Sequence, residues 1–179
     1  MRAEDQLSLE ERCRSCADAP RTLTMIEIQK IRADEGAEAA GLIMAQFEQH
    51  IFADYTEEGK TRVRQHVTAA YLLGDDMENF TLVAKLGQAI VGVAKVRSGN
   101  HLSMLFVAAP FQRRGYGGRL LTSAMAECKA RNPAVTTITA SGSRFALTFF
   151  LQRGFRAEGE EKHVNGMCFT PIRSTIAGK

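Results

Sequence analysis

The sequence has only four cysteines and no long apolar run. A membrane-spanning helix needs about 18 or more consecutive apolar residues, and no segment approaches that length. The first residues also lack the apolar core that a signal peptide requires. We therefore expect a cytoplasmic protein with no membrane partner.

A concentrated basic region is missing as well. The formal net charge is +3, and the Lys and Arg residues are spread along the chain without a basic tract that alternates with aromatic residues. Such a distribution favours a small anionic ligand over nucleic acid.

The few cysteines do not form a metal site. Cys13 and Cys16 make a C-x-x-C motif, but a structural zinc site needs two more ligands at suitable spacing, and none follows. Cys128 and Cys168 lie in apolar or mixed surroundings, so we expect reduced, half-buried side chains. We predict no metal, and the role of the C-x-x-C pair is left open.

The length and composition fit one domain. A chain of 179 residues with 45% hydrophobic content can build a substantial core. Residues 1–20 are charged and polar without a clear period, and they are interpreted as a flexible N-terminal extension. Residues 21–179 form the predicted domain.

Hydrophobic periodicity predicts the order β-α-α-β-β-β-α-β-α-β-β, an α/β fold with a mixed sheet and helices on both sides. The expected strands are 22–31, 80–86, 89–97, 102–107, a strand from 135 to about 140, and two closing strands near 155–162 and 164–171. The expected helices are 33–52, 56–73, 115–131 and one that begins after Ser143.

A turn with the order Gln-x-x-Gly-x-Gly is the most informative motif. It follows a strand and leads directly into a helix, so its backbone N–H groups lie at the positive end of that helix. Two arginines add bidentate donors, which predicts a guest with a pyrophosphate or several phosphates. Arg119 and Leu120 stand where a Walker A loop or a dinucleotide fingerprint would need other residues. The residues of the turn are Gln112, Arg113, Arg114, Gly115, Tyr116, Gly117 and Gly118.

This turn resembles motif A of the GNAT superfamily, the acyl-CoA-dependent N-acetyltransferases. Residues 143–155, which end in Gly154-Phe155, resemble motif B of the same family, with Ser143 as a plausible N-cap and Gly154 as a likely C′ residue. The resemblance covers roughly residues 22–172 and is weak before Asn79. It implies a single GNAT domain that uses acetyl-CoA as co-substrate.

The resemblance also assigns the cofactor contacts. The backbone from Arg113 to Gly118 would hold the coenzyme A pyrophosphate, and the fourth strand would splay from the fifth. Main-chain groups near Leu105, Phe106 and Val107 would then bind pantetheine like an added strand, and Ser143 and Phe150 would line the cofactor from motif B. If no bulge intervenes, Leu105 and Val107 point to the same side as His101 and Ser103.

The candidate general base is His101. Many family members have a glutamate six residues before the hydrophobic residue that closes the fourth strand, and counting back from Val107 gives His101 here. Imidazole, with a reference pKa near 6.5, suits base work directly or through a water. The alternative is an exposed polar residue at a hairpin mouth.

The family's usual acid is absent. Many members have a tyrosine four residues before the Gly of motif B, and this chain has Phe150 there. Because a thiol has a pKa near 8.5, its thiolate leaves without much help, and activity can survive the loss.

Two functional classes therefore remain open. The first is an N-acetyltransferase in which a small or lysine-like primary amine attacks acetyl-CoA directly through a tetrahedral intermediate. The second is a catalytically weak CoA-binding sensor or interaction module. The resemblance further implies an acceptor pocket near residues 52–55 and 162–167, and a homodimer is possible. The acceptor itself has no diagnostic pattern.

Overall fold

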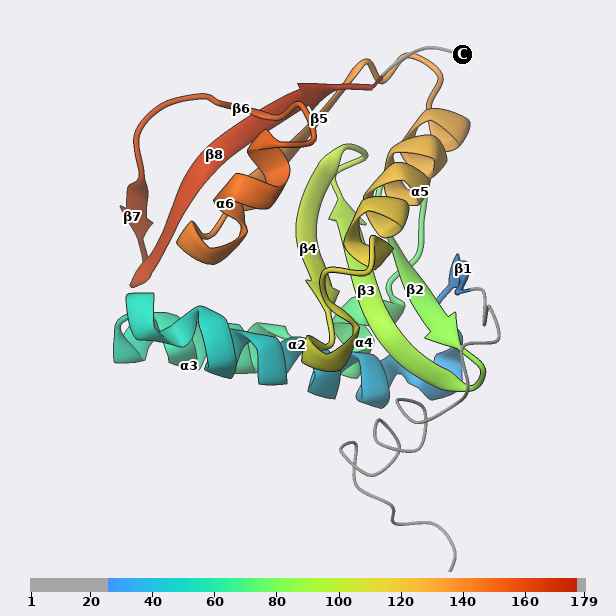
Figure 1. Ribbon diagram of the computed structural model, residues 1–179, viewed down its shortest axis with the longest axis horizontal. Coiled ribbons are helices and arrows are strands. Elements are labelled where there is room, and N and C mark those ends of the chain that lie inside the picture. Colours follow the sequence, from blue (N-terminus) through green and yellow to red (C-terminus); the bar gives the residue numbers. More distant parts are fainter. Residues whose placement is uncertain (1–25, 177–179) are drawn as a thin grey trace, which may run out of the picture.

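A mixed β-sheet forms the centre of the molecule (Figure 1). The computed structural model describes residues 26–176. Within them the sheet has the strand order β1-β2-β3-β4-β5-β8-β6, with β7 paired to β8. The β4–β5 pair is parallel and the other pairs are antiparallel. The strands are β1 (Glu27–Lys30), β2 (Phe80–Leu86), β3 (Ala89–Arg97), β4 (His101–Val107), β5 (Thr137–Gly142), β6 (Arg156–Ala157), β7 (Lys162–Val164) and β8 (Met167–Thr175).

Helices cover both faces of the first half of the sheet. Helix α5 contacts β2, β3 and β4, whereas α2 and α4 pack on the opposite side, and α6 packs on β5 and β8 (Figure 1). Strands β2 and β3 are buried along almost their whole length, as expected for strands covered on both faces. The helices are α2 (Gly36–His50), α3 (Glu57–His66), α4 (Ala69–Leu73), α5 (Tyr116–Arg131) and α6 (Arg144–Leu151), with short 3-10 turns η1 (Ala33–Glu35), η2 (Phe52–Asp54) and η3 (Ala109–Phe111).

The predicted fold class and the central elements are confirmed. Strands β2, β3 and β4 and helices α5 and α6 lie within one residue of their expected starts. The Ser143 hydroxyl accepts from the N–H of Ala146 and caps α6, as expected. At the other end Gly154 has φ 84°, and the N–H of Phe155 bonds the carbonyl of Phe150, so α6 ends in the predicted glycine cap.

The predicted helix over 56–73 is wrong in one respect, because the segment forms two helices. Val67 leaves the helical region with ψ 82°, and α3 ends at His66. The hydroxyl of Thr68 then accepts from the N–H of Tyr71 and caps the new helix α4. A threonine that caps a helix offers the backbone a partner that competes with continuation of the preceding helix.

The closing strands also differ from the prediction. The expected strand over 155–162 is broken into β6 and β7, because residues 158–161 combine three glutamates with Gly159 at φ 151°. The second closing strand starts at Met167 and runs to Thr175. Asn165 and Gly166, with φ of 50° and 77°, form the tight turn between β7 and β8 that this residue pair favours.

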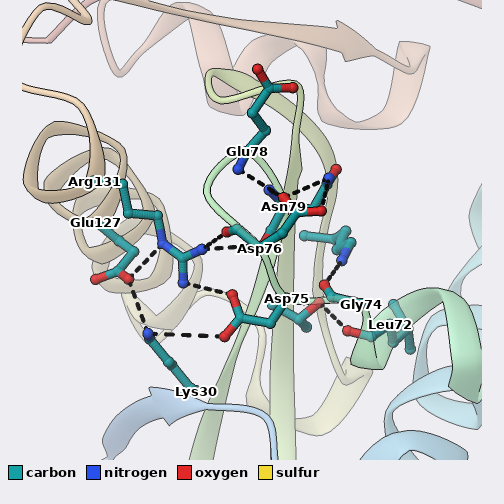
Figure 2. Close-up of polar contacts among 11 residues, drawn as sticks. Lys30, Leu72, Gly74, Asp75, Asp76, Glu78, Asn79, Glu127 and Arg131 are labelled. Atoms are coloured by element: carbon teal, nitrogen blue, oxygen red, sulfur yellow. Dashed lines mark hydrogen bonds and ion pairs between the residues drawn. The ribbon is translucent and has the colours of Figure 1, made fainter.

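The loop between α4 and β2 is fastened to the end of α5 (Figure 2). The Arg131 guanidinium pairs with Asp75 at 2.7 Å and with Glu127 at 2.8 Å, and it donates to the carbonyl of Asp76. Lys30 on β1 completes the group, 3.5 Å from Glu127. Because the network links β1, the loop and α5, it holds α5 in place against the sheet.

Two of the four cysteines lie within the described residues. Cys128 and Cys168 are unpaired thiols that are more deeply buried than expected. Burial raises the pKa of Cys128 to about 11 and raises that of Cys168 as well, so both stay protonated at neutral pH. The predicted extension over 1–20, with Cys13 and Cys16, lies outside the described residues, and so does the part of the first expected strand before residue 26.

Candidate active site

A cavity with a volume of about 1320 Å³ lies where β4 and β5 separate, and residues of both strands line it. The two strands pair only at His101 with Thr139 and Leu102 with Ala140. Beyond these pairs the strands diverge as expected, and the backbone from Ser103 to Val107 has no ladder partner in β5. A strand edge of this kind can pair with an extended ligand.

A bulge interrupts β4 at the base of the gap. Lys95 pairs with Met104 and Val96 pairs with Leu102, so Ser103 has no counterpart in β3. The alternation from His101 to Val107 was expected only if no bulge intervened, and this condition is not met. The Ser103 hydroxyl donates to the Lys95 carbonyl at 3.1 Å, and Tyr71 donates to Ser103 at 3.3 Å. These hydroxyls fix the bulge and are both engaged.

The glycine turn presents unpaired backbone donors at the other end of β4. Arg113 and Gly115 have φ of 61° and 83°, which turns the chain sharply before α5 begins at Tyr116. Within the described part of the chain, none of the N–H groups from Arg113 to Gly118 donates a hydrogen bond. The first helical bond is that of Arg119 to the Gly115 carbonyl, at 3.1 Å. Six N–H groups at the positive end of a 16-residue helix make a strong anion site.

The side chains of the turn have different positions. Arg113, Tyr116 and the glycines line the cavity. Arg114 instead lies over the Phe111 ring, 5.7 Å from its centroid, and is not part of the lining. Gln112 donates to the Val107 carbonyl at 3.0 Å and to Gln46 at 2.8 Å. Its amide therefore holds the turn against β4 and α2, and both of its N–H bonds are made within the protein.

Arg153 is a basic residue that the sequence reasoning missed. Its guanidinium lies over the Phe149 ring, 4.6 Å from the centroid, and packs directly on the Cα of Gly118. A Cβ on Gly118 would come within 2.7 to 2.9 Å of the three terminal guanidinium atoms. The missing side chain of Gly118 therefore lets a cation from the turn after α6 approach the unpaired amides at the start of α5. In the sequence, the position of Arg153 directly before the capping Gly154 was the one signal that could have indicated its role.

His101 lies where β4 and β5 still pair. Its Nδ1 is 2.9 Å from the Thr139 hydroxyl, and the ring lines the cavity. Burial and, to a lesser extent, the charge of Arg97 lower the pKa of His101 from 6.5 to about 4. The pKa of His101 therefore lies well below the reference value of imidazole, and the ring is neutral at neutral pH. When Nδ1 carries the proton toward Thr139, Nε2 keeps a free lone pair.

Motif B contributes an apolar wall. Phe150 is only 5% exposed and packs edge-on against Phe149 and Phe155 at centroid distances of 5.2 and 5.0 Å. The position of the usual acid is thus part of the core and lines the cavity with carbon alone. Ser143 also lines the cavity. Tyr55 lines the cavity together with Tyr71 and Tyr116, and burial raises the pKa of Tyr55 to about 12.

The described residues contain no cluster of three or more His, Cys, Asp or Glu that could hold a metal ion. Among the helices of the same residues, none is long and apolar enough to cross a membrane.

The family comparison matches the chain over residues 51–176 to a model described as an acetyltransferase (GNAT) domain. A comparison with curated protein sequences gives no match. The matched range includes β4, the glycine turn, β5 and α6, which together surround the cavity.

Solved structures share the fold. A GCN5-related N-acetyltransferase from Rhodopseudomonas palustris is 24% identical, with a TM-score of 0.69 over 83% of this chain and 94% of its own. The PaiA N-acetyltransferase of Thermoplasma acidophilum, solved with coenzyme A, is 15% identical, with a TM-score of 0.68 over 84% of this chain and 99% of its own. The N-acetylglutamate synthase of Neisseria gonorrhoeae, solved with coenzyme A and N-acetyl-glutamate, is 18% identical, with a TM-score of 0.61 over 86% of this chain and 36% of its own.

Proposed function

This chain belongs to the GNAT acetyltransferase family, and from that membership we propose that it transfers an acetyl group from acetyl-CoA to a primary amine. The observation that supports this most is the continuity of two features. The edge Ser103–Val107, which is unpaired on the β5 side, is followed after the short turn η3 by the six unpaired N–H groups of the glycine turn. An extended arm with amide groups and a pyrophosphate at one end fits this arrangement.

The anion end of the site has three kinds of donors. The backbone of residues 113–118 supplies N–H groups, the start of α5 supplies its dipole, and Arg113 and Arg153 supply charge. The pantetheine arm would lie along the β4 edge, about 16 Å long for five residues. This places the thioester near the bulge at Ser103, close to His101. Backbone N–H groups of β4 would polarise its carbonyl.

The pKa values of the amine and of His101 determine which proton His101 can accept. An amine with a pKa near 10 holds its proton far more tightly than an imidazole with a pKa of about 4. His101 therefore does not deprotonate the free ammonium. The neutral amine attacks, the C–N bond forms, and Nε2 accepts the proton that the new bond makes acidic. The C–S bond then breaks, and the thiolate leaves without an acid at Phe150.

A second candidate function is a coenzyme A-binding module with little chemistry. The apolar surroundings of Phe150 favour it, since the wall of motif B offers no proton to the leaving group. The two functions make the same prediction for binding and different predictions for turnover.

The first test is calorimetric titration with acetyl-CoA, with ATP and NAD as controls, followed by detection of free thiol with a broad panel of amines. We expect selective binding of acetyl-CoA and amine-dependent thiol release. Binding without thiol release from any amine would favour the binding module. A folded protein free of carried-over ligand that does not bind acetyl-CoA would contradict both functions.

The pH dependence of turnover tests the state of His101. Because its pKa is about 4, the imidazole is already unprotonated throughout the ordinary assay range. We expect kcat/KM, divided by the fraction of unprotonated amine, to stay constant between about pH 5.5 and 8.5. The measurement is a pH series with one acceptor amine. A break near pH 6.5 that disappears in His101→Asn would show an ordinary imidazole pKa and contradict the prediction.

A further inference from the structure

The end of the cavity near His101 is electropositive. Among the described residues that line the cavity there is no Asp or Glu, but there are four arginines and three histidines. Two of the arginines, Arg113 and Arg153, belong to the glycine turn and its surroundings. The other two are Arg62 in α3 and Arg97 in β3, and Arg97 lies beside His101 at the start of β4. His101 and Val107, at the two ends of β4, are about 20 Å apart along the strand, so one phosphate group cannot bind both the glycine turn and Arg97.

Arg62 and Arg97 differ in whether their guanidinium groups are free to bind a ligand. Arg62 is already paired with Glu58, at 3.0 Å. Arg97 makes no ion pair or side-chain hydrogen bond with any residue that the structure describes, and its exposed guanidinium keeps its full donor capacity. The carboxylates of Asp54 and Glu161, near the closing hairpin, are both paired with Arg144, at 2.9 and 2.6 Å. Neither of these two carboxylates is therefore free to bind a second ammonium group of an acceptor.

Arg97 and His101 are neighbours across the strands. They are direct partners in the antiparallel pairing of β3 and β4, so their side chains lie on the same face, with Cβ atoms roughly 5 Å apart. Arg97 also lowers the pKa of His101, which is consistent with this proximity. A ligand whose amine faces His101 can therefore place an anionic group on Arg97 within a few bonds.

We propose that the acceptor is an amino acid whose carboxylate binds Arg97 while its amino group faces His101. This rests on the proposed function and names its substrate class. A planar guanidinium matches a carboxylate with two parallel hydrogen bonds. A polyamine or a lysine in a basic peptide would instead bring further positive charge to a cavity whose lining has no acid.

The test uses matched pairs of acceptors, each of the common amino acids and its carboxamide, with spermidine added. The carboxamide keeps size and shape but removes the negative charge. A charge-assisted bidentate contact predicts a kcat/KM, per unprotonated amine, about 10- to 100-fold higher for the acid than for the amide of the preferred pair. Spermidine or amides used as well as the acids would overturn the proposal.

Variants assign the effect to Arg97. Arg97→Gln should remove the preference for the acid, because the rate with the acid falls to that with the amide, and it should leave the Kd of acetyl-CoA unchanged. The matched control is Arg156→Gln on β6, an exposed arginine outside the cavity, which should keep the preference. A preference that persists in Arg97→Gln would contradict the assignment.

A binding experiment separates this proposal from the proposed function. The complex with coenzyme A is titrated with the same acids and amides in a calorimeter, which needs no turnover. Acids that bind through Arg97 without any acetyl transfer would contradict the proposed function but support an amino acid as the ligand of Arg97. Acetyl transfer with equal binding and equal rates for acids and amides would support the proposed function but contradict the role of Arg97.

Discussion

Substitution of valine for Gly117 is expected to weaken acetyl-CoA binding by at least about 100-fold while the protein stays folded. Gly117 is the second residue of α5, with its N–H among the six unpaired donors. A Cβ at this position would lie 3.4 Å from the Phe149 ring and 3.7 Å from Cγ2 of Val107. It fits, but the two further methyl groups of valine would enter the space where the β4 edge meets the turn.

The fold should tolerate this change. Gly117 has a helical conformation, and valine is no worse than glycine in a helix, by the usual propensities. The measurement is calorimetric titration with acetyl-CoA, together with circular dichroism and a thermal melt. Ala126→Val is the matched control, because Ala126 is an exposed residue of the same helix more than two turns away. Unchanged affinity in a folded Gly117→Val protein would mean that the turn does not bind the ligand.

The elements that the sequence predicted well are those with local causes. The strands from 80 to 107 alternate with glycine-containing turns, and α6 has its own cap and its own terminating glycine. Each of these signals acts within a few residues, so no tertiary information is needed. The split of the helix over 56–73 had such a signal too, since Thr68 is a good N-cap. The Asn165–Gly166 turn likewise marked the start of β8.

The parts of the site that were missed depend on contacts between distant segments. Arg153 reaches the glycine turn only because Gly118, which is 35 residues earlier in the sequence, has no side chain. The bulge at Ser103 depends on the register between β3 and β4, which periodicity within β4 does not reveal. The lowered pKa of His101 has the same origin, because burial between strands and the charge of Arg97 both come from the folded structure.

The second large effect concerns His101, whose replacement by asparagine is expected to lower kcat by about 100-fold or more. In the wild-type structure the Thr139 hydroxyl lies 2.9 Å from Nδ1 of His101. The amide of asparagine can still reach this hydroxyl, but it has no basic nitrogen in place of Nε2. The Kd of acetyl-CoA should stay unchanged, because the glycine turn lies at the far end of β4. Stopped assays of thiol release and calorimetric titration measure the two quantities.

Thr139→Val separates chemistry from structure at the same position. It removes the side-chain hydrogen bond between β4 and β5 and keeps the imidazole, so a purely structural role of His101 predicts equal losses in Thr139→Val and His101→Asn. A base predicts a loss in Thr139→Val of less than about tenfold, because only the orientation of the ring is weakened. If His101→Asn retained kcat within about threefold, the amine would need no protein base. The site would then act through position and backbone polarisation alone.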